Sequence, residues 1–227
     1  MNMSTSRIIA YFDRIDSRAG HYPGKILKVT EFGEFSPAPL GPLELRIEEL
    51  RKERAIPESG IFFDGGSGDG RVTYLMSKKG YDAYGMEGDH ELACQGRING
   101  VRLLELGQRR TDRAVVLGHG NFVNTREYEQ QLGILIGEIK LFFNYQSNGK
   151  TLAELIAAES PVGTKYLYLS HDARTPTFVS APELEHKRTK KLDTERPMYL
   201  RVYEKVRCRQ NPTPSRKHAH IPWATVA

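Results

Sequence analysis

Short apolar runs alternate with longer amphipathic stretches along most of the chain. The short runs have the length of buried strands, whereas the longer stretches place apolar residues at near-helical spacing. The expected strands are residues 61–63, 81–86, 114–117, 139–143 and 165–169. The expected helices are residues 43–54, 72–79, 90–106, 126–137 and 151–159. Strands that alternate with helices need crossover connections, so the pattern predicts an α/β fold with a mainly parallel sheet and helices on both faces.

The segments around this alternation are less regular. Residues 36–42 contain three prolines and are expected to form an extended lead-in. Residues 198–206 read as one more strand, and because no clear helix precedes it, we expect it to run antiparallel near the sheet edge. Residues 173–197 show no clear pattern. We therefore expect a folded domain over residues 43–209, an N-terminal lead-in over 1–42 and a disordered tail over 210–227.

Composition places this domain among ordinary globular proteins. Of the 227 residues, 39% are hydrophobic and 27% charged. Residues 1–22 are polar and charged, and no apolar run reaches the length that a membrane span needs. We therefore expect a cytoplasmic protein without a membrane partner. Cys94 and Cys208 give no disulfide framework, and neither they nor the histidines have metal-ligand spacing, so we expect no metal site.

The net charge of +5 is unevenly distributed. Residues 187–217 contain eleven Lys and Arg against three acidic residues, a local charge of +8, which leaves about −3 for the rest. A basic segment of this kind can attract RNA or an acidic protein, or it can be a solvated surface.

A glycine-rich segment joins the first expected strand of the domain to a helix. Residues 64–71 read Asp-Gly-Gly-Ser-Gly-Asp-Gly-Arg. Gly66, Gly68 and Gly70 allow a tight turn and let a ligand lie against the backbone. Because parallel sheets bind ligands at the carboxyl ends of their strands, this turn is the expected binding site.

The residues around this turn favour a cationic ligand. The dinucleotide motif G-x-G-x-x-G would need a third glycine at Arg71 or Thr73, and no Gly-Lys-Ser/Thr follows as in a P-loop. Asp64 and Asp69 flank the turn instead, and two carboxylates repel a pyrophosphate. They attract the ammonium and sulfonium groups of S-adenosylmethionine. Glu87 ends the second strand, at an expected exposed position where a carboxylate can accept ribose hydroxyls.

These residues resemble a known family. Residues 62–71 and 85–87 look like motifs I and II of class I S-adenosylmethionine-dependent methyltransferases, and the resemblance covers about residues 40–172. It implies a Rossmann-like sheet of the seven-stranded type with an antiparallel edge strand. The segments 118–122 and 169–172 are similar to a small archaeal and eukaryotic group that includes protein-lysine methyltransferases without a SET domain.

The resemblance also implies roles for individual residues. It assigns the methionine part of the cofactor to the turn, the ribose to Glu87, the adenine amino group to Asn121 and the adenine ring to Phe122. The turn residues concerned are Asp64, Gly65, Gly66, Gly68, Asp69 and Gly70.

The acceptor is less well defined than the cofactor. Asn144 is followed by Tyr145-Gln146, whereas relatives that methylate amides or base amines often have Pro-Pro. We expect Asn144 and Tyr145 to line the acceptor channel, with a protein lysine as acceptor. The alternatives are an RNA, held by the basic segment, or a small molecule. An alternative of another class is a protein that binds the cofactor without catalysing methyl transfer. A NAD-linked oxidoreductase is the hypothesis we favour least.

Overall fold

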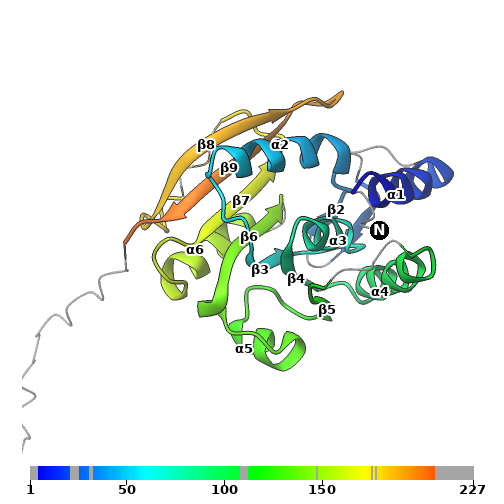
Figure 1. Ribbon diagram of the computed structural model, residues 1–227. Helices are drawn as coiled ribbons and strands as arrows, with labels where there is room; N and C mark the ends of the chain where they lie inside the picture. Colours follow the sequence, from blue (N-terminus) through cyan, green and yellow to red (C-terminus); the bar gives the residue numbers. More distant parts are fainter. Residues whose placement is uncertain are drawn as a thin grey trace, which may run out of the picture.

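A computed structural model describes residues 5–20, 26–30, 33–107, 112–146, 148–174, 176 and 178–207. In this part of the chain, a seven-stranded sheet runs through the centre with helices on both sides (Figure 1). A separate antiparallel hairpin pairs β1 (Lys28–Thr30) with β2 (Gly33–Phe35). The predicted Rossmann-like α/β class is therefore confirmed. The expected tail over 210–227 lies outside the described residues.

The central sheet has the strand order β5-β4-β3-β6-β7-β9-β8. Neighbours from β5 to β7 are parallel, and β9 is antiparallel to both β7 and β8. The strands are β3 (Gly60–Gly65), β4 (Tyr81–Glu87), β5 (Val115–His119), β6 (Ile139–Tyr145), β7 (Lys165–Ser170), β8 (Leu184–Leu192) and β9 (Met198–Lys205). The order reverses between β3 and β6, which creates a crevice at the carboxyl ends of these two strands.

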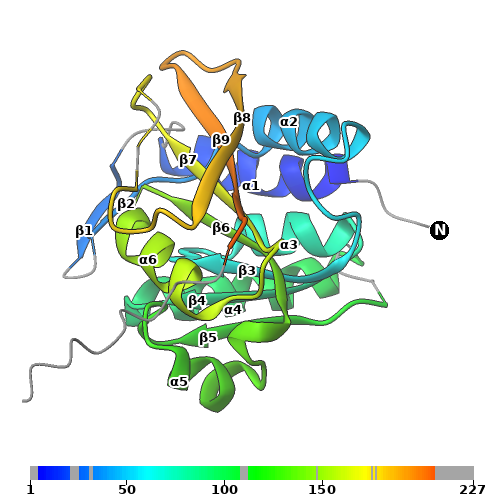
Figure 2. The same ribbon diagram turned by 90° about the vertical axis from the view of Figure 1, so that its left-hand side faces the viewer.

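Helices cover both faces of the sheet, as predicted. One face carries α1 (Thr5–Ala19), α2 (Leu40–Lys52), α3 (Arg71–Lys78) and α4 (His90–Glu105). The other face carries α6 (Gly149–Glu159) and a π-helix, η1 (Tyr128–Leu132). Two short elements flank this π-helix: α5 (Thr125–Glu127) before it and a 3₁₀ turn, η2 (Ile136–Glu138), after it. Figure 2 shows α1 and α5 on opposite sides of the sheet.

Alternation along β3 separates the two cores. Phe62 belongs to the cluster under α1, α2 and α3, while Phe63 points the other way and stacks on Tyr128 with ring centroids 4.4 Å apart. Successive side chains of a strand point to opposite faces, so a strand covered on both sides is apolar throughout. This arrangement explains why the sequence shows β3 as an unbroken apolar run.

Two expected helices differ from the structure, one at its start and one in its continuity. The helix expected over 43–54 begins at Leu40, because Pro42 falls in its first turn, where the missing N–H costs nothing. The expected lead-in over 36–42 is therefore helical in its last three residues. The single helix expected over 126–137 is three short pieces, because Gly133 adopts a positive φ of 69° and ends the π-helix.

The sequence analysis did not predict α1, the hairpin or β8. In α1, Ile8, Tyr11 and Phe12 are buried against the core at helical spacing, although the segment as a whole is polar. β8 occupies the sheet edge, beyond the strand predicted there, and only its end residues Leu184 and Leu192 are buried. Charged residues in between suit an edge strand, because they discourage pairing with another chain.

No helix among the described residues combines the length and the apolar character needed to cross a bilayer.

Candidate cofactor and acceptor site

The glycine-rich turn lies in the crevice where the strand order reverses. It connects β3 to α3, and the amides of Gly66 and Ser67 donate to the Met86 carbonyl at 2.9 and 3.1 Å, which ties the turn to β4. Gly66, Gly68 and Gly70 have φ values of 76°, 53° and 80°. Other residues rarely adopt this left-handed region, so the turn requires glycine at these positions.

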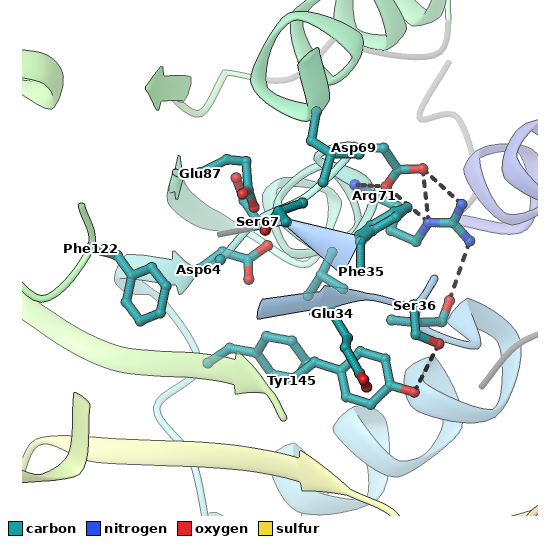
Figure 3. A pocket seen from close by; sticks show the side chains of 16 residues that line it. Glu34, Phe35, Ser36, Asp64, Ser67, Asp69, Arg71, Glu87, Phe122 and Tyr145 are labelled. Atoms are coloured by element: carbon teal, nitrogen blue, oxygen red, sulfur yellow. Dashed lines mark hydrogen bonds and ion pairs between the residues drawn. The ribbon is translucent and has the colours of Figure 1, made fainter. Parts of the chain in front are cut away.

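A cleft with about 600 Å³ of empty space, partly open to solvent, lies beside this turn (Figure 3). It reaches from Glu87, at the end of β4, to Tyr145, at the end of β6. Its lining combines carboxylates with apolar and aromatic side chains. The lining residues are Thr30, Glu34, Phe35, Ser36, Ala38, Asp64, Gly66, Ser67, Asp69, Arg71, Val72, Glu87, Leu92, Phe122, Phe143 and Tyr145.

Asp64 is a buried carboxylate at the floor of the cleft. The residue is 2% exposed, and its Oδ2 accepts a 2.8 Å hydrogen bond from the Thr73 hydroxyl. Burial raises the pKa of Asp64 to about 7, and the nearby carboxylates of Glu87 and Asp69 contribute in the same direction. A cation placed beside Asp64 would relieve this cost of charging it.

Asp69 is held by an internal cation. Arg71 donates from Nε to its two oxygens at 2.9 and 3.1 Å and from Nη2 at 2.7 Å. The same guanidinium donates to both oxygens of Asp16 on α1, at 2.8 and 2.9 Å. Burial lowers the pKa of Arg71, but Asp69 and Asp16 raise it by more, so the guanidinium stays charged. The negative charge of Asp69 is therefore compensated by Arg71. Asp64, in contrast, has the neutral Thr73 hydroxyl as its hydrogen-bond donor.

Glu87 is buried, contrary to the exposed position expected from the sequence. It is 7% exposed, and it accepts hydrogen bonds from the amides of Gly68 at 2.8 Å and Asp89 at 2.9 Å. Burial raises its pKa, and these two bonds oppose the rise. Because β4 ends against the glycine turn, Glu87 holds the turn in place and also presents its carboxylate to the cleft.

Only one residue of the expected adenine pair lines the cleft. Phe122 follows β5 and lies against the turn, where a Cβ on Gly65 would approach its ring to 3.0 Å. Asn121 lies outside the lining, and its Oδ1 accepts from the Val123 amide at 3.1 Å. Its expected contact with the adenine amino group remains a prediction.

The two expected channel residues occupy different environments. Asn144 is fully buried, and its Nδ2 donates to the Gly65 carbonyl at 2.8 Å, so it braces β6 against the start of the turn. Tyr145 is half-buried and lines the cleft. Its hydroxyl lies 3.4 Å from Ser36 Oγ and 3.3 Å from His171 Nε2. Among these two, Tyr145 is the residue placed to meet a ligand in the cleft.

Comparison with solved structures identifies the fold of the chain. No protein-family model matches the sequence, and no curated protein matches it significantly. Among solved structures, magnesium protoporphyrin IX methyltransferase from Synechocystis, crystallised with S-adenosylmethionine, is similar with a TM-score of 0.53 at 11% identity, over 89% of this chain and 97% of that one. The chain has the methyltransferase fold.

Two further structures with this methyltransferase fold agree. Precorrin-6y C5,15-methyltransferase from Geobacter metallireducens gives a TM-score of 0.52 at 12% identity, over 83% of this chain and 95% of that one. An S-adenosylmethionine-dependent methyltransferase from Methanosarcina mazei gives 0.51 at 13% identity, over 69% and 97%. These identities establish the shared architecture and leave the acceptor open.

The β1–β2 hairpin contributes cleft residues that the sequence analysis missed, namely Thr30, Glu34 and Phe35. Lys28 in β1 pairs with Asp89 and Glu91 at the start of α4, at 2.8 and 2.7 Å. At the end of β2, the Phe35 ring packs so closely on Gly68 that a Cβ there would lie 2.4 Å from it. The hairpin strands are only three residues long, too short for periodicity to reveal them.

Proposed function

We propose that the protein is an S-adenosylmethionine-dependent methyltransferase. The observation that carries the proposal is the uncompensated negative charge at the glycine turn: Asp64 and Glu87 are buried there with neutral hydrogen-bond donors. The bound cofactor would supply an electrophilic methyl group on a positive sulfur. Asp64 and the turn would hold its methionine part, Glu87 its ribose and Phe122 its adenine.

The same charges argue against a dinucleotide or a nucleoside triphosphate. A pyrophosphate at this turn would face Asp64, whose pKa is raised to about 7 partly by carboxylates that are already nearby. Bringing further negative charge into a buried site costs free energy unless cations compensate it. Arg71, the cation in the lining of the cleft, is engaged by Asp69 and Asp16. The donor set therefore fits a ligand with positive charge.

For the acceptor, we propose a lysine side chain of a protein. Glu34 places a carboxylate in the lining of the cleft, at the side where Tyr145 lies (Figure 3), and a carboxylate attracts an ammonium group. In-line methyl transfer then needs mainly orientation and short distance, because the leaving sulfur is already positive.

The basic segment gives RNA less support than its charge suggests. Lys187 pairs with Glu185 and Glu204, and Lys190 pairs with Glu49 and Glu53. Arg188 also pairs with Glu53. The described part of the segment thus attaches β8 to the end of α2, and phosphates would have to compete with these glutamates.

Calorimetry with S-adenosylhomocysteine, S-adenosylmethionine and NAD tests the cofactor. We expect micromolar binding of the first two and none of NAD, and Asp64→Asn should weaken binding while the exposed Asp193→Asn should not. NAD binding in place of the other two would refute the proposal.

Labelled S-adenosylmethionine and a cell lysate test the acceptor. We expect protein-bound label that resists ribonuclease, is lost with protease and maps to methylated lysine by mass spectrometry. Label that ribonuclease removes would assign RNA as the acceptor. Cofactor binding with no label in either fraction would favour a small-molecule acceptor or a protein without turnover.

A further inference from the structure

Two side chains that can carry a proton meet beside the acceptor end of the cleft. Tyr145, at the end of β6, directs its hydroxyl toward Ser36 and toward His171, which follows β7. The distance from Tyr145 Oη to His171 Nε2 is 3.3 Å, and the two rings are 6.4 Å apart at an angle of 57°. Because β6 and β7 are neighbouring parallel strands, their carboxyl ends bring these residues together.

The surroundings of His171 determine which ring nitrogen carries hydrogen. Its Nδ1 lies 3.1 Å from the Pro197 carbonyl oxygen, which can only accept a hydrogen bond. In the neutral ring, Nδ1 is therefore the protonated nitrogen and Nε2 holds the lone pair. The Tyr145 hydroxyl then donates to Nε2, and its oxygen can accept from a group in the cleft as well as from the Ser36 hydroxyl.

A buried arginine fixes the loop that carries His171. Arg201 on β9 donates from Nη1 to the Ser170 hydroxyl at 2.8 Å, and from Nη2 to the Arg174 carbonyl at 3.1 Å and to the Asp172 carbonyl. Its side chain is fully buried, so these bonds form in a low-dielectric setting where they are strong. The loop is thus held from both sides of His171.

We propose that His171, acting through Tyr145, accepts the proton that the acceptor lysine must lose before it can be methylated. This inference rests on the proposed function. A lysine ammonium has no lone pair, and at neutral pH it is almost fully protonated. Tyr145 would be the catalytic residue that touches the acceptor nitrogen, and His171 the residue that positions its hydroxyl and stores the proton.

The proton and electron transfers balance without another reactant. The ammonium gives one proton to Tyr145 Oη, while the Tyr145 proton moves to His171 Nε2. The freed nitrogen lone pair bonds to the methyl carbon as the carbon–sulfur bond breaks, and that electron pair stays on sulfur. The products are a methylated ammonium, a neutral thioether and an imidazolium. His171 is half-buried, so it can return the proton to solvent.

The pKa of Tyr145 agrees with a relay. Burial raises it, although the contact with Ser36 opposes the rise, so the phenol stays protonated and does not itself act as the base. The groups around His171 are the Tyr145 hydroxyl from β6, Asp172 and Arg174 from its own loop, and Arg201 from β9. Arg174 lowers the pKa of Asp172, so this carboxylate stays charged and paired at neutral pH.

Nitrogen-15 NMR of the full chain tests the geometry without any acceptor. We expect the neutral His171 ring to carry its proton on Nδ1, and its Nε2 signal to shift in Tyr145→Phe but not in Tyr84→Phe. A neutral ring protonated on Nε2 would overturn the proposal.

Methyl transfer from labelled S-adenosylmethionine to the proteins of the lysate tests the chemistry. We expect His171→Gln and Tyr145→Phe to lower the rate about 100-fold, the low end for a lost proton acceptor. At saturating S-adenosylmethionine, the wild-type rate should level off above neutral pH, whereas the His171→Gln rate should keep rising with pH, because the acceptor lysine must then lose its proton to solvent. The exposed His186→Gln serves as a matched control and should behave as the wild type.

Calorimetry with S-adenosylhomocysteine tests the proposed function separately. We expect each variant to bind it with the affinity of the wild type. A His171→Gln enzyme with a wild-type rate, or a slower one whose rate levels off above neutral pH as in the wild type, would overturn the relay. Wild-type cofactor binding without transfer to lysine would also overturn it and leave the cofactor assignment standing. Loss of cofactor binding in the wild type would refute the proposed function itself.

Discussion

Replacing Asp64 by Asn should stabilise the ligand-free protein at the cost of its cofactor affinity. The folded protein holds this carboxyl at a pKa of about 7, against an ordinary value of 3.8. Between these values the folded state binds more protons than the unfolded state, so the free energy of unfolding falls as pH rises. A pKa difference of about 3 corresponds to about 4 kcal/mol in the free energy of unfolding, and this stability is lost by pH 8. Asparagine keeps an oxygen for the Thr73 hydroxyl and removes the charge.

Urea denaturation at pH 5 and pH 8 measures this effect. At pH 8, where wild-type Asp64 is charged, we expect Asp64→Asn to be more stable than the wild type by up to about 4 kcal/mol. At pH 5, about one pH unit above the ordinary pKa of 3.8, the difference should shrink to about 1.6 kcal/mol. The exposed carboxylate variant Asp193→Asn should follow the wild type at both values.

Binding should change in the opposite direction. A cationic ligand beside Asp64 favours the carboxylate, so wild-type affinity for S-adenosylhomocysteine should rise between pH 6 and 7.5 as less free energy is needed to remove the proton. In Asp64→Asn this rise should be absent and the affinity weaker throughout. A variant that loses stability at pH 8, or binds as tightly as the wild type, would show that Asp64 is a structural hydrogen-bond acceptor and not the cation site.

Three other substitutions test the contacts around the cleft. Arg71→Met leaves its two aspartates buried without a cation and should lower the free energy of unfolding by about 3–5 kcal/mol in urea titrations; a loss below about 1 kcal/mol would contradict this. Glu87→Ala should weaken S-adenosylhomocysteine binding in calorimetry by about 2–4 kcal/mol and also destabilise the fold, because two buried amides lose their acceptor. Unchanged binding would remove Glu87 from the site. Lys190→Glu places like charges beside the glutamates at the end of α2 and should cost about 1 kcal/mol in thermal unfolding, whereas the exposed Lys150→Glu should cost less.

The sheet could be predicted from the sequence because its strands are covered on both faces. The segments of β3, β6 and β7 are largely apolar, and the helices between the strands repeat apolar residues at a spacing that packing on a sheet requires. The glycine turn was predictable for a related reason. A positive φ at three alternate positions admits little besides glycine, so the backbone conformation is visible in the residues themselves.

The missed parts of the site depend on contacts between distant segments. Asp16 is one of several charged residues in a polar N-terminal stretch, and its meeting with Arg71 requires α1 to pack beside α3. Tyr145 and His171 are 26 residues apart and come together only through the parallel pairing of β6 and β7. Glu87 ends its strand as predicted, but its burial arises from the turn that folds over it, which strand periodicity does not describe.

We propose that the contrast between Asp69 and Asp64 lets this site fold without its ligand and still bind a cation. Two flanking carboxylates, both uncompensated, would repel each other across a turn that is already buried. Arg71 compensates the charge of Asp69, and its guanidinium donates two further hydrogen bonds to Asp16, which fastens α1 to the start of α3. Asp64 keeps a neutral partner and a pKa near neutrality. In this proposal one aspartate stabilises the turn and the other makes it selective for a cation, although the sequence presents them as an equivalent pair.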